Sequence, residues 1–126
     1  MATTLDLTPD QIERYRESAK KRLQAESKEI ESRREQAWQA AKRASHVLKN
    51  QFGATRVVVF GSLVQKAGFT RWSDVDVAAW GIAPEDTFQA IGIISELDTS
   101  VPVNLVDVNT ARTSLIEVIE RDGIEL

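Results

Sequence analysis

The stretches VVVFGSL at residues 57–63 and SDVDV at residues 73–77 decide the fold that this sequence predicts. A continuous run of β-branched residues is typical of a buried strand, and Gly61 allows the chain to turn sharply at its end. In the second stretch apolar residues alternate with Asp74 and Asp76, which is typical of a strand whose two carboxylates point to the same side. We therefore expect two successive strands with polar groups gathered where they meet.

Upstream of these strands the sequence predicts a long helical segment. Thr8 suits an N-cap, Pro9 the first helical position, and Gln11 the returning side chain of a capping box. Neither Gly nor Pro follows until Gly53. One long helix, or two consecutive helices, is therefore expected to fill residues 9 to about 51.

The two halves of this helical segment differ in composition. Residues 10–35 are mostly charged, with a thin apolar stripe formed by Ile12, Tyr15, Ala19, Leu23 and Ile30. Such a stripe suits a coiled-coil-like seam, between copies of this chain or with a partner, whereas the alternative is a solvated helix held by charge pairs. The stripe thickens from residue 37 to residue 48, so we expect a charged extension over residues 1–36 and a folded core over residues 37–126.

Downstream of Gly53 the pattern predicts alternating strands and helices. We expect Phe88, Ile91 and Ile94 or Ser95 to share one face of a helix. The predicted elements are strands at Arg56–Phe60, Asp74–Trp80 and Val101–Val106; a short helix or turn at Ser62–Ala67; a helix from Pro84 to about Leu97; a last helix capped by Asn109 or Thr110 that runs to Arg121 and stops at Gly123; and a tail or edge strand at Ile124–Leu126.

Composition narrows the classes of protein to be considered. The 126 residues suit one domain, and the absence of cysteine excludes disulfides, thiolate nucleophiles and cysteine-based zinc sites. Without a signal-like N-terminus or a long apolar run, we expect a soluble, cytoplasmic protein that does not enter a membrane. Residues 1–56 carry 12 Lys and Arg against 8 Asp and Glu, whereas residues 57–126 carry 4 against 11. The acidic half holds the candidate site, which favours divalent metal over direct nucleic-acid binding.

The candidate site combines a phosphate-binding turn with a pair of metal ligands. Gly61 and Ser62 stand where a strand gives way to a helix start, which favours phosphate oxygens. Asp74 and Asp76 repel each other unless a cation lies between them, and oxygen ligands of this kind suit Mg²⁺ or Mn²⁺. A Gly-Ser pair alone is most often a simple turn, and a lone Asp-x-Asp is most often a solvated strand face. In succession the two motifs are a much stronger signal.

The two motifs together resemble those of the nucleotidyltransferase superfamily, specifically its small single-domain members, the minimal nucleotidyltransferases. The resemblance covers residues 37–126 and rests on a hydrophobic strand, Gly61-Ser62, eleven further residues, and Asp74 with Asp76. It implies a nucleotidyltransferase-like mixed sheet flanked by helices. It also implies ATP as nucleotide donor, metal at the two aspartates and the triphosphate at Gly61 and Ser62.

The third predicted strand departs from the family pattern. Residues 102–107 read PVNLVD, and where the family usually has a third carboxylate this chain has Asn104. Asn104 cannot act as a base, and Asp107 can replace it only if the strand ends or bulges there. Lys66 and Arg71 lie between the two motifs, and either is a candidate contact for the triphosphate.

Trp72 and His46 are two further side chains with chemistry suited to function. Trp72 stands beside the loop before Asp74 and is a candidate contact for a base, with the alternative that it is only a surface residue. His46 is the only histidine, and we expect it to be exposed or structural on the long helix.

The function implied by the resemblance is transfer of a nucleotide, AMP from ATP, to a hydroxyl group. Because 126 residues leave no room for a second, acceptor-binding domain, the acceptor is expected on another chain. For relatives of this size the resemblance implies a small helical partner of the HEPN class, in a toxin–antitoxin pair where the transferase is the antitoxin. Two alternatives remain open: a binding module that neutralises its partner by contact, and a free-standing transferase acting on a small molecule.

Overall fold

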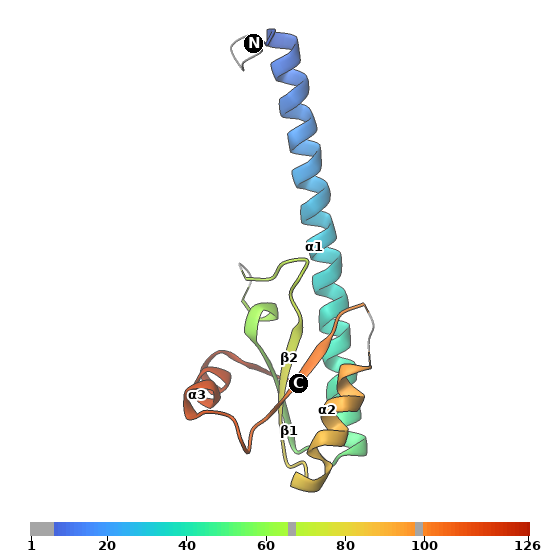
Figure 1. The fold of residues 1–126 in the computed structure, drawn as a ribbon, viewed down its shortest axis with the longest axis vertical. Coiled ribbons are helices and arrows are strands. Elements are labelled where there is room, and N and C mark those ends of the chain that lie inside the picture. Colours follow the sequence, from blue (N-terminus) through green and yellow to red (C-terminus); the bar gives the residue numbers. More distant parts are fainter. Residues whose placement is uncertain (1–6, 66–67, 98–99) are drawn as a thin grey trace.

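The structure of the chain, a computed structural model, describes residues 7–65, 68–97 and 100–126. Its longest element is the helix α1, Pro9–Gln51, which runs without interruption for 43 residues (Figure 1). At 1.5 Å per residue this is about 65 Å. The helical segment is therefore one helix rather than two.

The start of α1 confirms the predicted capping box. The Thr8 hydroxyl accepts a hydrogen bond from the backbone N–H of Gln11 at 3.2 Å, and the Gln11 side chain accepts one from the N–H of Thr8 at 2.9 Å. Pro9 occupies the first turn, where its missing N–H costs nothing. This end of the helix is thus stabilised by its own sequence.

Four strands form one mixed sheet in the order β3-β2-β1-β4. The central strand β1 pairs antiparallel with β2 on one side and with β4 on the other, whereas β2 and β3 are parallel. The predicted strands are confirmed to within two residues, and the C-terminal tail is an edge strand. The strands are β1 Arg56–Phe60, β2 Val75–Trp80, β3 Val103–Asp107 and β4 Ile124–Glu125.

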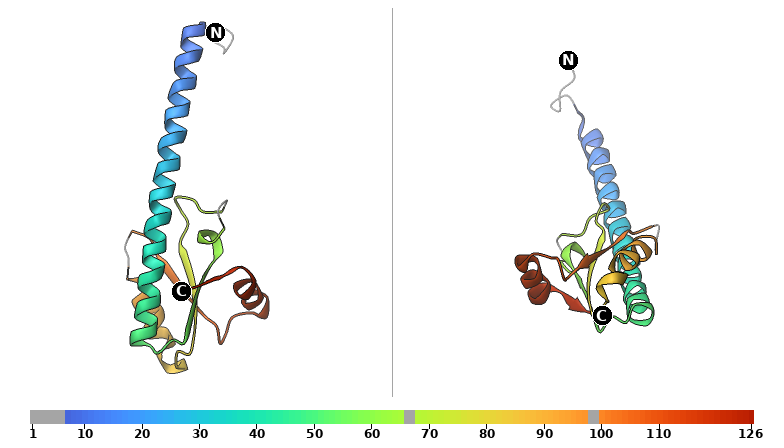
Figure 2. Two further views of the ribbon diagram at one scale, coloured as in Figure 1. Left: turned by 180° about the vertical axis from the view of Figure 1, so that it is seen from behind. Right: turned by 60° about the horizontal axis from the view of Figure 1, so that its bottom comes forward.

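Helices cover both faces of this sheet. The helices α1 and α2 lie on one face and α3 lies on the other (Figures 1 and 2). Together these elements form the expected α/β arrangement of a mixed sheet flanked by helices. The remaining helical elements are η2 Gly61–Leu63, η3 Pro84–Asp86, α2 Thr87–Ser95 and α3 Thr113–Asp122. Of the short helix predicted after β1, residues 66 and 67 lie outside the described residues.

The core consists of two hydrophobic clusters, one on each face of the sheet. On the α1 face, alanines and Leu48 of the helix pack against alternate residues of the strands, among them Val57, Val59, Val75 and Val77. On the α3 face, Ile119 packs against the intervening strand residues Val58, Phe60 and Ala78. This alternation fixes the direction of every strand side chain. It therefore also fixes the face on which Asp76 of β2 and Asn104 of β3 lie.

The apolar face predicted for α2 is buried only in part. Phe88 does not face the sheet but is 88% exposed, because α2 packs through Thr87, Ala90 and Ile94. Phe88 follows Thr87 by one position, which turns it about 100° around the helix and away from the sheet. The buried face of α2 is therefore smaller and narrower than the predicted one.

The predicted cap of the last helix is wrong. The N-cap of α3 is Arg112, with no side-chain hydrogen bond to the helix. Asn109 and Thr110 instead lie in the preceding turn, where both donate to the carboxylate of Asp107. Asp107 therefore stabilises this turn at the end of β3. The predicted stop at Gly123 is confirmed.

The N-terminal half of α1 projects beyond the sheet (Figures 1 and 2). Contact with the core begins at Ile30, and the fully buried residues of the helix begin at Ala37. Because β1 returns from the C-terminal end of α1, the end of β1 and the start of β2 lie at the level of the middle of the helix. None of the helices in the described residues has an apolar stretch long enough to cross a membrane.

Candidate functional site

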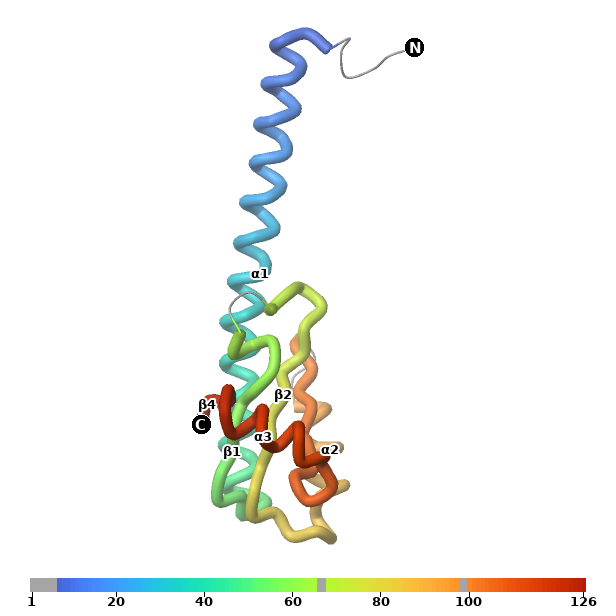
Figure 3. Tube along the Cα trace, turned by 90° about the vertical axis from the view of Figure 1, so that its left-hand side faces the viewer, coloured from blue at the N-terminus to red at the C-terminus, as the bar shows by residue number. Residues whose placement is uncertain are grey.

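Asp76 lies on β2 at the centre of the candidate site. Its partners across the sheet are Phe60 on β1 and Asn104 on β3. Cross-strand partners point to the same side of a sheet, so Asp76 and Asn104 share the face that α3 partly covers. Figure 3 looks onto this face, with α3 crossing its lower part and the turn after β1 lying above.

Gly61 brings the end of β1 into contact with the Asp76 carboxylate. Its backbone has a φ of 79°, a conformation that glycine adopts readily and other residues resist. A Cβ atom placed on Gly61 would lie only 2.8 Å from Oδ2 of Asp76. Glycine is thus favoured here twice, because another residue would strain the turn and would displace the neighbouring carboxylate. The two motifs that the sequence separates by fifteen positions are in contact in the fold.

The environment of Asp76 disfavours its negative charge. Burial raises the pKa of the Asp76 carboxyl group above its ordinary value, and repulsion by the nearby Asp74 raises it further. A hydrogen bond from Nδ2 of Asn104 to Oδ1 of Asp76, at 3.4 Å, acts in the opposite direction. A cation beside Asp76 would remove this penalty.

The donor set fits a hard divalent cation that takes further ligands from elsewhere. No Lys or Arg of the described residues forms an ion pair with Asp74 or Asp76, and no group of three or more acidic, histidine or cysteine ligands is present in that part of the chain. Two carboxylates and an amide are oxygen donors of the kind Mg²⁺ prefers, but they fill only part of its octahedral shell. The remaining positions suit water and phosphate oxygens.

Ser62 follows directly in the short helix η2. The chain enters this helix from the extended Phe60, and the N–H of Val64 closes the turn on the carbonyl of Gly61 at 3.1 Å. The first N–H groups of such a turn have no partner within it. Ser62 is half-buried beside Gly61, and its part in phosphate binding stays a prediction.

Two arginines of α1 brace the segments that carry the site, and sequence reasoning missed both. Arg33 donates to the carbonyls of Ser73 at 3.2 Å and Ser100 at 3.0 Å, next to the starts of β2 and β3. Arg34 donates to the carbonyl of Leu63, in the turn after Gly61, at 3.2 Å. The sequence feature that could have indicated these contacts is the Arg33-Arg34 pair, which lies where the charged half of the helix becomes alanine-rich. These residues were predicted to belong to the extension, yet they contact the core.

Arg71 and Trp72 are turned toward α1. The guanidinium of Arg71 lies 3.8 Å from the Glu26 carboxylate and 5.9 Å from the ring of Trp72. Trp72 is 82% exposed and borders a surface cavity together with Arg33 and Ser100. The structure therefore does not place either side chain against the carboxylate pair. Lys66, the other predicted triphosphate contact, lies outside the described residues.

The two remaining candidates also lie apart from the pair. Asp107 is opposite Ala79 in the sheet register, three residues beyond Asn104, and its carboxylate binds the following turn. The strand neither ends nor bulges early enough to bring Asp107 beside Asp76. His46 is exposed on α1, with its ring 3.2 Å from the amide of Asn50.

Comparison with known proteins adds no family to this description. No protein-family model matches the sequence, and no curated protein is similar to it.

The raised pKa of Asp76 leads to a first testable prediction. The pKa of Asp76 is higher in the folded chain than in the unfolded chain, so the unfolded chain loses this proton at lower pH. The free energy of unfolding therefore falls as the pH rises through and above the ordinary aspartate range near 4. Asp76→Asn should therefore melt at a higher temperature than the wild type at pH 7, with a smaller difference at pH 4.

Thermal unfolding with and without Mg²⁺ provides the measurement. Mg²⁺ should raise the melting temperature of the wild type and leave that of Asp76→Asn nearly unchanged, because only the wild type retains both carboxylates. Glu85→Gln, at an exposed acid on η3, is the control and should behave as the wild type. A lower melting temperature for Asp76→Asn than for the wild type at pH 7 would contradict the conclusion that the negative charge of Asp76 is disfavoured in the fold.

Proposed function

We propose that this protein is a metal-dependent nucleotidyltransferase that takes a nucleotide, AMP from ATP, and attaches it to a hydroxyl group. The observation that carries the proposal is the contact between Gly61 and the Asp76 carboxylate. A turn suited to phosphate thereby adjoins a carboxylate pair suited to Mg²⁺ or Mn²⁺. The match to the nucleotidyltransferase motifs supports the same conclusion.

The residues have separate parts in the proposed reaction. Gly61 and Ser62 would bind the terminal phosphates, and Asp74 and Asp76 would hold the metal together with oxygens of the triphosphate. Bound Mg²⁺ would supply Lewis-acid stabilisation of the attacking and leaving oxygens. The acceptor oxygen would attack the α-phosphorus as its hydroxyl proton passes to water. The bond between the α-phosphorus and the bridging oxygen of the β-phosphate would break to release pyrophosphate. Asn104 would orient Asp76 through its amide.

The proposed acceptor is a hydroxyl on another protein. This proposal is supported by α1, which extends beyond the site end of the sheet and offers a surface there for another chain. On the resemblance alone, we propose that the partner is a small helical protein of the HEPN class and that this chain is the antitoxin of the pair.

Calorimetry of ATP binding tests the proposed site. The wild type should bind ATP more tightly with Mg²⁺ than without it, because phosphate oxygens complete the metal shell that the two carboxylates begin. In Asp74→Asn/Asp76→Asn this magnesium-dependent gain should disappear while the fold persists. Equal affinity for Mg²⁺–ATP in the wild type and the double variant would refute the site.

One observation favours a second candidate function. The position beside Asp76 on β3 holds the neutral Asn104, whose amide donates to the carboxylate. A protein with this arrangement and no transfer activity would be a binding module that neutralises its partner by contact. Labelled ATP supplied with Mg²⁺ and the partner distinguishes the two, since only the transferase leaves label on the partner.

A further inference from the structure

The projecting half of α1 carries an apolar stripe that no part of the described chain covers. Its members are Ile12, Tyr15, Ala19 and Leu23. Tyr15 is 67% exposed and Leu23 is 64% exposed, although both are large side chains that normally seek burial. Together they form an apolar surface along about three turns of helix.

This stripe lies on the same side of α1 as the sheet. Successive helix positions are about 100° apart, so the spacing of three and four residues that joins Ile12 to Leu23 continues through Ile30 to the buried residues of the lower half. Those residues include Ala37, Ala41 and Leu48, which pack against the sheet. A molecule bound to the stripe would therefore lie on the same side of α1 as the sheet, directly beyond the end of the sheet.

That end of the sheet is the one that carries the candidate site. Glu26 continues the stripe toward the core and is paired with Arg71, in the loop before β2. This ion pair marks the end of the open surface. Two turns further along, Arg34 reaches the carbonyl of Leu63, in the turn that Gly61 begins. The stripe and the site segments are thus neighbours along one helix.

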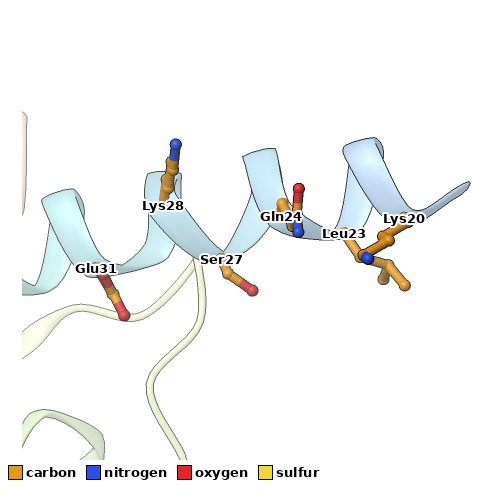
Figure 4. A pocket seen from close by; sticks show the side chains of 6 residues that line it. All are labelled: Lys20, Leu23, Gln24, Ser27, Lys28 and Glu31. Carbon is orange, nitrogen blue, oxygen red and sulfur yellow. The ribbon is translucent and has the colours of Figure 1, made fainter. Parts of the chain in front are cut away.

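The rim of the stripe is basic. Arg16 lines a surface hollow with Ile12 and Tyr15, and Arg22 lines another with Ala19, Leu23 and Glu26, the acid that pairs with Arg71. Lys20 borders a third hollow with Leu23, and Figure 4 shows the two side chains projecting from the same side of the helix. Three cations therefore flank the apolar surface. A binding partner would need negative charge at the matching positions.

A second copy of this chain fits this surface poorly. An antiparallel pairing centred on Ala19 would match Tyr15 with Leu23, but the same register sets Ile12 against Glu26, whose carboxylate is already paired with Arg71. A parallel pairing in register sets Glu26 beside its own copy in the seam. A carboxylate set against an apolar side chain or against a like charge opposes association. The charge pattern consequently favours another protein over self-association.

We propose that the projecting half of α1 is a docking arm for an amphipathic helix of another protein, one whose apolar face is bordered by Asp and Glu. The apolar stripe would bury the partner's apolar residues, and Arg16, Lys20 and Arg22 would pair with its carboxylates. The docked helix would lie over the site end of the sheet. The docking is independent of catalysis, whereas the role of the docked protein as acceptor rests on the proposed function.

The test uses two synthetic helical peptides of about three heptads, each with leucine at both core positions. One carries glutamate and the other lysine at the flanking positions, and these like charges keep each peptide from pairing with itself. Fluorescence anisotropy on the full chain, without ATP or Mg²⁺, should show the glutamate peptide binding at least about tenfold more tightly, with an affinity that falls as salt is added.

Two variants assign the binding to the stripe. Tyr15→Ser/Leu23→Ser should weaken binding of the glutamate peptide at least about tenfold, whereas Phe88→Ser, at an exposed apolar residue on α2, should bind as the wild type. Circular dichroism verifies that both variants keep their helix. The proposal would be overturned if the two peptides bound equally or if neither bound. It would also be overturned if sedimentation showed a wild-type dimer that the double variant dissociates. None of these outcomes depends on ATP binding, so docking and catalysis are judged separately.

Discussion

Replacing Asn104 with aspartate is expected to accelerate nucleotide transfer by about 10²–10⁴-fold at saturating Mg²⁺ and ATP, the usual range for general-base assistance. Asn104 lies opposite Asp76 in the sheet, with its amide 3.4 Å from the carboxylate. A carboxylate at that position can take the proton of the attacking hydroxyl and add an oxygen ligand for the metal. Single-turnover transfer of labelled AMP measures the change.

Asp107→Asn is the matched control for this prediction. Asp107 lies on the same strand but three residues on, and its carboxylate is bound by Asn109 and Thr110. Its replacement should lower stability slightly, through the loss of a charged acceptor in that turn, and leave the transfer rate unchanged. Similar rates in the wild type and in Asn104→Asp would show that a third carboxylate at this position does not limit the reaction.

Gly61→Ala is expected to reduce Mg²⁺–ATP binding and transfer by about 10²-fold, the scale of a misplacement of about 1 Å in a catalytic site. The new methyl group would lie 2.8 Å from Oδ2 of Asp76, so the carboxylate would have to move. The positive φ adds a backbone cost of roughly 1–2 kcal/mol. Calorimetry and the transfer assay measure the two effects.

Gly53→Ala separates the backbone cost from the effect on the site. Gly53 also has a positive φ, 69°, but no atom lies within 4 Å of a Cβ placed on it. Both variants should therefore share a similar backbone cost in unfolding free energy, and only Gly61→Ala should also displace Asp76 and lose binding of the nucleotide. If Gly53→Ala weakened binding as much, the contact between Gly61 and Asp76 would have no special role.

Periodicity and local chemistry were enough to predict most of the fold. The β-branched run of β1, the alternation in β2 and the capping box at Thr8 are signals carried by a few adjacent residues. The errors arose where tertiary packing chooses between local options. Phe88 belongs to the predicted apolar face of α2, but the sheet receives the smaller Ala90 instead. The N-cap of α3 was misplaced because Asn109 and Thr110 bind Asp107 rather than the helix.

The candidate site was predictable in part for the same reason. Gly61, Asp74 and Asp76 belong to compact motifs, and a pairing of the two strands brings them together. The braces from Arg33 and Arg34 reach across 40 and 29 sequence positions to Ser73 and Leu63. No local pattern indicates such contacts, since they depend on how α1 is laid against the sheet. Arg71, conversely, looked free to bind phosphate but lies beside Glu26.

The two halves of α1 differ in their free energy of local unfolding, because only the second half is packed against the sheet. Residues 9–29 are held mainly by helical hydrogen bonds and the capping box, so they can open at low free energy, whereas the buried alanines open only with the whole domain. Arg33 and Arg34 stand at the transition between these regimes. An opening that spread past them would release the carbonyls of Leu63 and Ser73 and loosen both segments of the site. Whatever steadies the projecting half of α1 therefore also steadies the segments that position Gly61 and Asp76.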